Sequence, residues 1–561
     1  MDSGSSRGVA DEDECGISTF VNSELRPVGG VLKIRPEDFR VRELPLVWAD
    51  EACCGGHWAA VAGSGGSTAD APFLRFALHK RGVDTLEALD ALAGACRVPT
   101  RHFGFAGIKD SFAITTQEIT VLRTKVTEAA LKTAAATLPQ LRVSGFCASE
   151  QALAPGTLAG NRFLLRVHLV RASARRVRLA MRSLRRRGFV NYVGMQRFGK
   201  AGVRSDQVGL AYLRGEYEHC VDTLLRQNSG SSSASGYAAG PQRRGSRSYI
   251  DRVPKWAEAF KRTNSADAAL RLLPPGGHWV ERRLLMALRK RQERDGGTAP
   301  VARASGGLEA PEPAMRRGVL CAWHEASREA FLSLPRSIRA LYVHSYVDRL
   351  WNLSATERLA QLGLAGPVEG DLIPDPTMPG SARVFRLGAS ESSCAGGGDG
   401  GTAAEPAPSM FEVLLPRPGT GAAMPAHAVG NLMRSYLTYD GLEAGGLRLE
   451  AMAGGGRDFL LRGTFRPVVS RPGRLRWSVE WPDPRRRVGE RTLLLDFSLG
   501  PGQYATMAVR ELMRQRPLRR PPRHVVFSDE SSEPEAEEEA QPLRAGGRKR
   551  RRSEAAAPST E

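Results

Sequence analysis

The chain has 561 residues, of which 41% are hydrophobic, and its formal net charge is +20 with a mean hydropathy of −0.31. This length allows about two to four domains with a sizeable core, and the absence of a run of about 18 apolar residues excludes a membrane-spanning helix. The basic excess favours a polyanionic partner, nucleic acid before membrane. The eight cysteines form no C-x-x-C pair, which fits a reducing compartment. Cys53, Cys54 and His57 could form a metal cluster, but their glycine-rich surroundings favour a loop with free thiols.

The N-terminal segment, residues 1–27, is small, polar and acidic. We expect it to be disordered, and its acids and lack of an apolar run support the expectation of neither a secretion signal nor a mitochondrial presequence. After it, Ile34 begins a strand that Pro36 interrupts, and the alternation of residues 39–43 resumes a strand.

A strand and a helix are expected next. Phe73–His79 is predicted as a strand that ends at Lys80. Asp84 and Glu87 then stand three residues apart, as in a capping box, before a helix that Pro99 closes. Strand and helix in such short order indicate an α/β or α+β domain.

The stretch from Phe103 to Val121, FGFAGIKDSFAITTQEITV, places a single carboxylate, Asp110, after a Gly-x-Lys turn and before a β-rich run. In most proteins an Asp at such a turn caps the turn. The alternative is a reacting group held at the end of a strand, and the surrounding sequence must decide between them.

The later elements alternate with regions rich in Ser, Gly, Pro and Ala, which we interpret as surface insertions. These insertions are residues 228–248, 294–316 and 389–409. The expected elements are the helix Thr127–Leu138, the strand Asn161–Arg171, the basic helix Val177–Arg187, the helix Arg336–Asn352, the strand Leu493–Leu499 and a helix from Ala505 to Met513.

No catalytic triad order, Walker A loop, H-E-x-x-H pair or EF-hand loop is present. An ionised Asp with aromatic and basic neighbours suits covalent chemistry on a nucleotide that has been flipped from its stack. Arginine and lysine would then bind phosphates, while rings and amides select the base. The candidates are Asp110, the rings of Phe39, Tyr192 and Tyr504, and the amides of Asn191 and Gln196.

Four sequence blocks resemble the TruD-type pseudouridine synthases, in the branch of the eukaryotic RNA-modifying enzymes. The similarity runs from about residue 28 to residue 515, and the blocks appear in the family's order. The blocks are RPEDFRVRE at 35–43, FLRFALHKRGVDTLEAL through FAGIKDSFAITTQEITV at 73–121, GFVNYVGMQRFG at 188–199 and LDFSLGPGQYATMAVREL at 495–512.

The resemblance implies an α+β protein with the pseudouridine synthase catalytic fold, a mixed and largely antiparallel sheet with flanking helices, into which an α/β TRUD domain is inserted. The two pieces of the catalytic core must pack together and leave an RNA cleft beside the insertion. The predicted divisions are a disordered segment at 1–27, the first core piece at 28–216, the TRUD domain with low-complexity insertions at 217–478, the second core piece at 479–520 and a disordered acidic and basic tail at 521–561.

By the same resemblance, Asp110 is the catalytic aspartate of an isomerase that acts on RNA uridine without a cofactor or a metal. The carboxylate would promote cleavage of the N1–C1′ bond, the uracil would turn, and C5 would rejoin C1′. Because this chemistry needs an ionised carboxylate at neutral pH, we expect a cationic neighbour, either Lys80 or Arg197. The alternative role for each of these two cations is a phosphate contact.

Three further positions match substrate-contacting residues of the family. Phe39 would pack near the target base, Asn191 would hydrogen-bond around the reaction centre, and Tyr504 would flank the uracil. In an arbitrary protein these three residues would be core aromatics and a turn asparagine.

Two positions depart from the family pattern. Ser111 and Phe112 follow the aspartate where basic residues are usual, and Val193 stands where an aromatic residue is usual. A lost stacking ring would cost about 1–3 kcal/mol of base contact.

Three functions remain open. The first is a monomeric pseudouridine synthase that modifies tRNA, with mRNA as a further RNA partner and no membrane. The second is an RNA-binding protein that keeps the fold with weak or no catalysis. The third, a chromatin-associated basic protein, rests on the tail alone. The basic run at 548–552 predicts location in the nucleus, with the cytoplasm as a second place, and its alternatives are a solvated charge run or an extra RNA contact.

Overall fold

The structure, a computed structural model, describes twelve ranges of the chain, and every statement below concerns these residues. All of them belong to the compact unit that ends at Arg520. None of their helices is both long and apolar enough to cross a membrane. The described ranges are 12–45, 71–154, 156–200, 203–226, 254–274, 278–295, 313–378, 380–386, 408–443, 447–449, 459–480 and 491–514.

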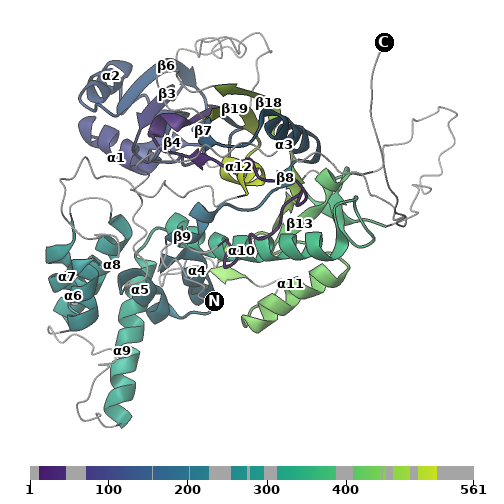
Figure 1. The fold of residues 1–561 in the computed structure, drawn as a ribbon. Coiled ribbons are helices and arrows are strands. Elements are labelled where there is room, and N and C mark those ends of the chain that lie inside the picture. The colour runs from purple at the N-terminus through teal and green to yellow at the C-terminus, as the bar shows by residue number, and fades with distance from the viewer. Residues whose placement is uncertain are drawn as a thin grey trace, which may run out of the picture. The chain divides into compact units, whose positions relative to one another are not determined.

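The main sheet has the strand order β18-β19-β7-β2-β5-β3-β6, with β1 added at β7 and β4 at β5 (Figure 1). Only the pair β2–β5 is parallel, so the predicted mixed and largely antiparallel sheet is confirmed. The strands are β1 (Val31–Leu32), β2 (Phe39–Leu44), β3 (Phe73–Arg81), β4 (Phe103–Phe105), β5 (Ile114–Leu122), β6 (Leu141–Ser149), β7 (Gly160–Val170), β18 (Gly473–Glu480) and β19 (Arg491–Leu499).

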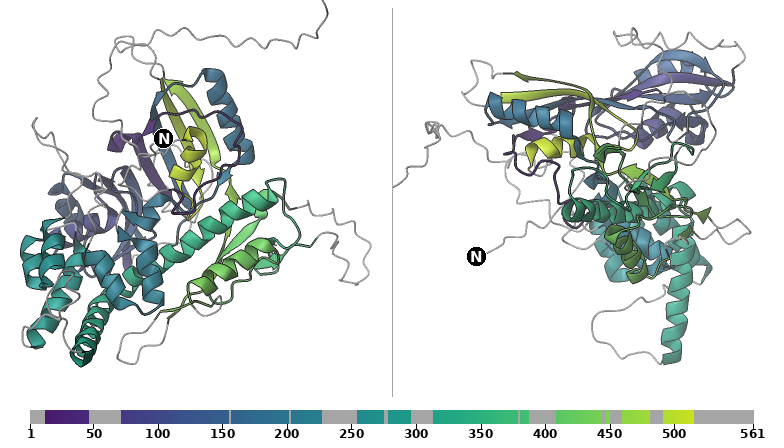
Figure 2. Two further views of the ribbon diagram at one scale, coloured as in Figure 1. Left: turned by 60° about the horizontal axis from the view of Figure 1, so that its bottom comes forward. Right: turned by 90° about the vertical axis from the view of Figure 1, so that its right-hand side faces the viewer.

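Four helices flank this sheet and cover its two halves. The helices α1 (Thr85–Ala95) and α2 (Glu128–Ala136) form a hydrophobic cluster with β3, β5 and β6. The helices α3 (Ala174–Arg187) and α12 (Ala505–Met513) share a second cluster with β2, β7 and β19. Both helices lie against this part of the sheet (Figure 2). The second cluster joins chain segments from both predicted core pieces, because β19 pairs along its length with β7.

Helix starts follow from side-chain caps. The carboxylate of Asp84 accepts a hydrogen bond from the backbone N–H of Glu87 at 2.9 Å, so α1 begins where the capping spacing predicts. The hydroxyl of Ser173 accepts from the N–H of Arg176, so α3 begins three residues before the predicted start at Val177. The apolar pattern marks only the buried part of α3, and its first turn is polar.

A second group of elements forms its own hydrophobic cluster, built mainly from α4 to α10. A four-stranded sheet of order β12-β11-β13-β16 lies in the same part of the chain. The helices are α4 (Ser205–Leu213), α5 (Tyr217–Leu225), α6 (Lys255–Thr263), α7 (Ala266–Leu272), α8 (Trp279–Arg294), α9 (Pro313–Leu332), α10 (Arg336–Leu362) and α11 (Ala428–Tyr439). The strands are β11 (Leu372–Pro374), β12 (Ala382–Val384), β13 (Leu414–Arg417) and β16 (Thr464–Pro467).

Three two-stranded ladders complete the described strands. They are β9 (Gly199–Lys200) with β10 (Val203–Arg204), β14 (Arg448–Leu449) with β15 (Phe459–Leu460), and β8 (Phe189–Val190) with β17 (Val469–Ser470). The predicted boundaries of the TRUD domain stay a prediction, because α10 contributes side chains to both large clusters.

The helix α10 is longer than the sequence predicts. It continues past Asn352 to Leu362 and ends before Gly363, whose positive φ of 69° favours glycine. Asn352 is a poor helix former, but here its amide bonds the backbone of Val193 and of Cys15, at distances of 2.8 to 3.0 Å. Tertiary partners therefore outweigh local propensity at this position.

Residues 12–27 differ from the expected disorder. Cys15 and Ile17 are fully buried in the cluster of α3 and α12, and the backbone N–H groups of Val21 and Asn22 donate to the carboxylate of Glu511. The segment is polar in composition, but these few contacts supply the burial that composition alone does not reveal. Residues 1–11 and the tail 521–561 lie outside the described ranges.

A buried ion pair fixes the end of α10. The guanidinium of Arg358 donates to both oxygens of Asp371 at 2.8 and 2.7 Å, and both side chains are fully buried. Nε2 of His427, which caps α11, is 3.0 Å from the same carboxylate. Burial alone would raise the pKa of Asp371, but the hydrogen bonds from Arg358 and His427 lower it to about 2.

This pair predicts a pH dependence of stability. Because the pKa of folded Asp371 lies below its unfolded value of about 3.8, its contribution is complete above about pH 4 and is lost as the pH falls through about 2. We expect about 2 kcal/mol of the free energy of unfolding to disappear in this window. Urea unfolding at a series of pH values measures it.

In Asp371→Asn the free energy of unfolding should no longer fall in this pH window, because the titrating carboxylate is gone. At pH 7 the variant should be about 3–5 kcal/mol less stable than the parent, because Arg358 keeps its buried charge without an anion. The matched control is Asp267→Asn, an exposed carboxylate paired with Arg271 on α7. Equal stability of Asp371→Asn and this control at pH 7 would contradict the prediction.

Candidate active site

Asp110 lies on the loop between β4 and β5. These strands pair antiparallel, with Phe103 opposite Val121, so the loop is held at the end of a short hairpin. The side chain of Asp110 is 29% exposed, and its carboxylate forms an ion pair with the ammonium of Lys33. The one carboxylate that the sequence singled out is therefore accessible to solvent and is paired with a cation.

Lys33 was not predicted as part of the site. It follows β1, which the pairing of Val31 and Leu32 with β7 holds in place. Its backbone has a positive φ of 60°, a region that residues with a Cβ rarely adopt. This geometry brings Nζ to 4.0 Å from the ring centre of Phe39, so that Lys33 contacts both Phe39 and Asp110.

Lys80 binds the backbone of the loop that carries Asp110. Its side chain is buried, and Nζ donates to the backbone carbonyls of Val83 at 2.8 Å, Lys109 at 3.3 Å and Asp110 at 2.8 Å. Burial lowers the pKa of Lys80 to about 8, while the nearby Asp110 partly opposes this effect. Lys80 therefore fixes the backbone at Asp110, whereas the cation on the carboxylate itself is Lys33.

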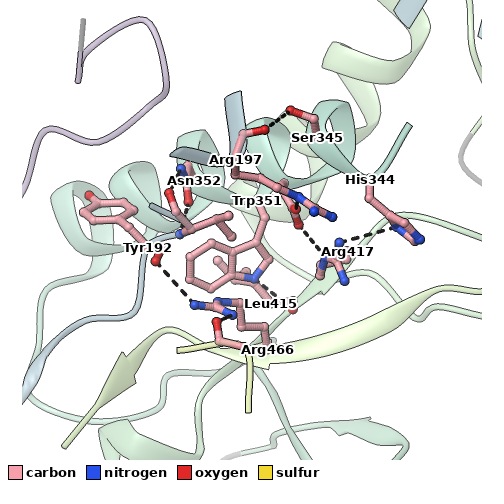
Figure 3. Close-up of polar contacts among 12 residues, drawn as sticks. Tyr192, Arg197, His344, Ser345, Trp351, Asn352, Leu415, Arg417 and Arg466 are labelled. Atoms are coloured by element: carbon pink, nitrogen blue, oxygen red, sulfur yellow. Dashed lines mark hydrogen bonds and ion pairs between the residues drawn. The ribbon is translucent and has the colours of Figure 1, made fainter. Parts of the chain in front are cut away.

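Asn191 follows α3 and β8, and its amide is occupied at both ends. Nδ2 donates to the carbonyl of Pro467 at 3.0 Å, and Oδ1 accepts from Arg466 at 2.8 Å. The same guanidinium donates to the carbonyls of Asn191 at 2.8 Å and Gly502 at 2.6 Å. It also donates to the carbonyl of Tyr192 at 3.3 Å (Figure 3). Arg466 thus orients the Asn191 amide and ties its segment to the turn before Tyr504.

Tyr504 is the N-cap residue of α12 and packs against the same segment. A Cβ built on Gly194 would lie only 2.8 Å from Cδ1 of the Tyr504 ring, so this close approach requires glycine. The ring centre is 5.9 Å from the guanidinium carbon of Arg466. Burial raises the pKa of Tyr504, which keeps its hydroxyl neutral.

Arg197 belongs to a charged cluster on α10. Its Nε donates to Asp348 at 2.8 Å, and Nε of Arg417 lies 2.6 Å from the other oxygen of this carboxylate (Figure 3). Nη2 of Arg417 is 3.5 Å from Nδ1 of His344. Burial and the two arginines lower the pKa of His344 to about 4, so this imidazole is neutral at pH 7.

The structure thus brings the predicted residues together in two groups. The first joins Phe39, Lys80 and Asp110. The second joins Asn191 and Tyr504 through Arg466, and the charges of Arg197 and Asp348 act on Tyr504. Both groups border the hydrophobic cluster of α3 and α12. The roles of these six residues in binding and catalysis stay predictions. Tyr192, a further candidate, is only 1% exposed, and its hydroxyl lies 2.6 Å from the hydroxyls of Thr19 and Thr356.

Sequence reasoning missed Lys33, Arg466, Trp351 and Asp348. Lys and Arg together number 80, so residue type gave no reason to select Lys33 or Arg466. Trp351 lies under Arg466, with its ring centre 5.3 Å from the guanidinium carbon and its indole N–H on the carbonyl of Leu415. Within the described ranges, no group of three or more His, Cys, Asp or Glu side chains could hold a metal ion, and Cys53, Cys54 and His57 lie outside them.

The mixed sheet with a single loop carboxylate has the architecture of the pseudouridine synthase fold. Comparison with family profiles makes the assignment specific, because the profile described as tRNA pseudouridine synthase D (TruD) matches residues 14–512. The chain belongs to the TruD family.

Curated relatives agree with this assignment. The chain is 29% identical over 463 residues to the human "Pseudouridylate synthase 7 homolog", an alignment that covers 79% of this chain and 59% of the relative. It is 28% identical over 507 residues to "tRNA pseudouridine synthase D" of Geobacter sp. (strain M21), which covers 89% of this chain and all of the relative. The chain therefore spans about three-fifths of the length of the eukaryotic relative.

A solved structure supports the fold. The crystal structure of the putative tRNA pseudouridine synthase D (TruD) from Methanosarcina mazei aligns with a TM-score of 0.51 at 17% identity. The alignment covers 90% of this chain and 98% of that one. At this identity the likeness concerns the fold alone.

Substitution of Arg466 tests how much its hydrogen bonds contribute to the free energy of unfolding. In Arg466→Met, the carbonyls of Asn191 and Gly502 and the Oδ1 atom of Asn191 lose a charged donor. An unsatisfied buried acceptor costs about 1–3 kcal/mol. Water can replace the donor at the exposed Gly502, so the two Asn191 acceptors decide the result, and we expect the free energy of unfolding to fall by about 2–4 kcal/mol. The midpoint of urea unfolding measures this loss.

Arg462→Met is the matched control, because Arg462 lies four residues earlier and is exposed. This control should change stability by less than about 0.5 kcal/mol. If Arg466→Met also stays within that range, Arg466 does not hold these segments together.

Proposed function

We propose that this protein is an RNA pseudouridine synthase that isomerises uridines in tRNA, and that mRNA is a further substrate. The proposal includes a monomer that works through the carboxylate of Asp110 without a cofactor. The observation that carries it is the pairing of the accessible Asp110 carboxylate with Lys33 in a chain of the TruD family. Two relatives are named for the same activity, tRNA pseudouridine synthase D and pseudouridylate synthase 7.

The chemistry follows from the charge of this carboxylate. An ionised Asp110 can promote cleavage of the uridine N1–C1′ bond, after which the uracil turns and C5 bonds to C1′. Lys33 balances the negative charge near the ring of Phe39 and holds the carboxylate in one orientation. Lys80 fixes the backbone carbonyl of Asp110, so the attacking group and its loop are both preorganised.

The second group of residues suits recognition of the base. Asn191 and Tyr504 are oriented by Arg466 and Gly194 before any substrate binds. A fixed ring can stack on a flipped base. The Asn191 amide is buried and bonded at both ends, so it can shape the polar wall beside that base. We propose that this group holds the uracil while Asp110 acts on the sugar.

The proposal predicts that Asp110→Asn makes no pseudouridine. The substitution keeps the shape of the side chain but removes the negative charge, so the carboxylate chemistry is lost while RNA affinity stays near the parental value. The measurement is pseudouridine mapping after incubation of bulk uridine-containing tRNA with the parent or with the variant.

Two further variants sharpen the assay. Lys33→Met should lower the rate by about ten- to a hundredfold, since a charge-assisted hydrogen bond contributes about 1.5–3 kcal/mol. Asp90→Asn, an exposed carboxylate on α1, is the matched control and should keep parental activity. Equal modification by the parent and Asp110→Asn would remove Asp110 from the mechanism. A parent that binds RNA and modifies none of it would refute the proposed enzyme.

A second candidate function is RNA binding on the same fold with weak or no catalysis. Val193 favours it, because its backbone is held by Asn352 and its small side chain is buried in the cluster of α3 and α12. A larger ring at this position would have to displace part of that packing. The pseudouridine assay of the parent protein separates the two functions.

We propose that the protein is located in the nucleus, with the cytoplasm as a second place. The support is the basic run at 548–552, which lies outside the described residues and has the composition of an import signal. We expect deletion of residues 521–561 to shift a fluorescently tagged protein from the nucleus to the cytoplasm. A tail deletion that stays nuclear would contradict this location signal.

A further inference from the structure

The helix α3 carries seven arginines and no acidic residue. Its buried face is formed by small and apolar residues, which pack against the sheet and α12. Four of the arginines, which we call the arginine stripe, lie at spacings of three and four residues and are exposed. They are Arg175, Arg178, Arg182 and Arg186.

The stripe forms one continuous surface. At 3.6 residues per turn, the four side chains fall within about 80° of one another around the helix axis, roughly opposite the buried face. At 1.5 Å per residue the stripe is about 16 Å long. Like charges at such spacings destabilise a helix, so this arrangement is unfavourable for folding alone.

No carboxylate of the described residues forms an ion pair with the stripe. The helix α8 gives a contrast within the same chain, because it is also rich in arginine and three of its arginines have carboxylate partners. There Arg289 pairs with Glu293, and both Arg291 and Arg294 pair with Glu329. The stripe on α3 therefore differs from these three arginines of α8, each of which has a carboxylate partner.

The stripe is rigidly connected to the candidate active site. Asn191 lies five positions after Arg186, a span of at most about 18 Å of chain. The connection passes through Gly188, where a Cβ would lie 2.2 Å from the carbonyl oxygen of Ser470, and through β8, which pairs with β17. An anion bound along α3 is thus held at a fixed place relative to Asn191.

We infer that the arginine stripe binds the sugar-phosphate backbone of the substrate RNA, outside the target uridine. This inference rests on the proposed function, because it names how the same RNA is held. A nucleic acid duplex carries about one phosphate charge per 1.7 Å of its axis, so a strip of about 16 Å faces enough phosphates for all four guanidinium groups. Phosphate contacts of this kind fix the register of the RNA while the uracil pocket selects the base.

The test compares two variants that lose the same charge. In the stripe variant all four stripe arginines become glutamine, which keeps a good helix propensity. In the control variant four paired arginines become glutamine. The control changes are Arg271→Gln, Arg289→Gln, Arg291→Gln and Arg294→Gln.

The first measurement is binding of fluorescently labelled bulk tRNA over a series of salt concentrations. Each phosphate contact contributes about 0.7 to 0.9 to the slope of log affinity against log salt, so the stripe variant should lose about 3 from this slope. Its affinity at about 0.1 M salt should fall at least tenfold. The control variant should keep the parental slope.

The second measurement is steady-state pseudouridine formation on the same tRNA. The stripe variant should raise KM at least tenfold and leave kcat within about twofold, because the stripe contacts the RNA and not the reacting atoms. Circular dichroism confirms that both variants fold. A parental salt slope in the stripe variant, or an equal loss in both variants, would overturn the inference.

Two outcomes separate RNA binding by the stripe from membrane binding and from the proposed enzyme activity. A stripe variant that loses binding to phosphatidylserine vesicles but keeps parental RNA binding would assign the stripe to a membrane surface and overturn the inference. A parent that makes no pseudouridine, but whose tRNA binding depends on the stripe, would refute the proposed enzyme and support the stripe.

Discussion

One guanidinium group, that of Arg466, joins three distant parts of the chain at the candidate site. It donates to the carbonyls of Asn191 and Gly502, and it lies over the ring of Trp351 on α10. Burial lowers its pKa only to about 10, so it remains a cation at neutral pH. A charged fork can satisfy several carbonyls at once, which no apolar residue could do in this place. The orientation of the Asn191 amide and the turn before Tyr504 both depend on this interaction.

The cations of the site contact different kinds of partner. Lys33 meets the carboxylate of Asp110, whereas Lys80 meets only backbone carbonyls beneath it. Arg197 and Arg417 share the carboxylate of Asp348 and are thereby held on α10. The arginines of α3 have no such anion among the described residues, which is why we assign them to RNA.

Membership of the TruD family and the geometry at Asp110 support the same function from independent directions. The family profile rests on sequence over residues 14–512, while the ion pair with Lys33 is a property of the folded chain. At Val193 the chain departs from the family pattern. The family pattern has a ring at this place, and here a buried valine fills the core instead.

The sequence alone predicted the class of fold and the mixed sheet, and it selected Asp110, Phe39, Asn191 and Tyr504 as candidate site residues, whose roles stay predictions. It could do so because these features are local, since alternation defines strands and the blocks keep their order. The tertiary structure decided which cation meets Asp110, because Lys33 lies 77 positions away and only the pairing of β1 with β7 brings it there. It also decided that residues 12–27 are packed and that α10 continues to Leu362. Both results depend on partners contributed by remote segments, and no local pattern records such partners.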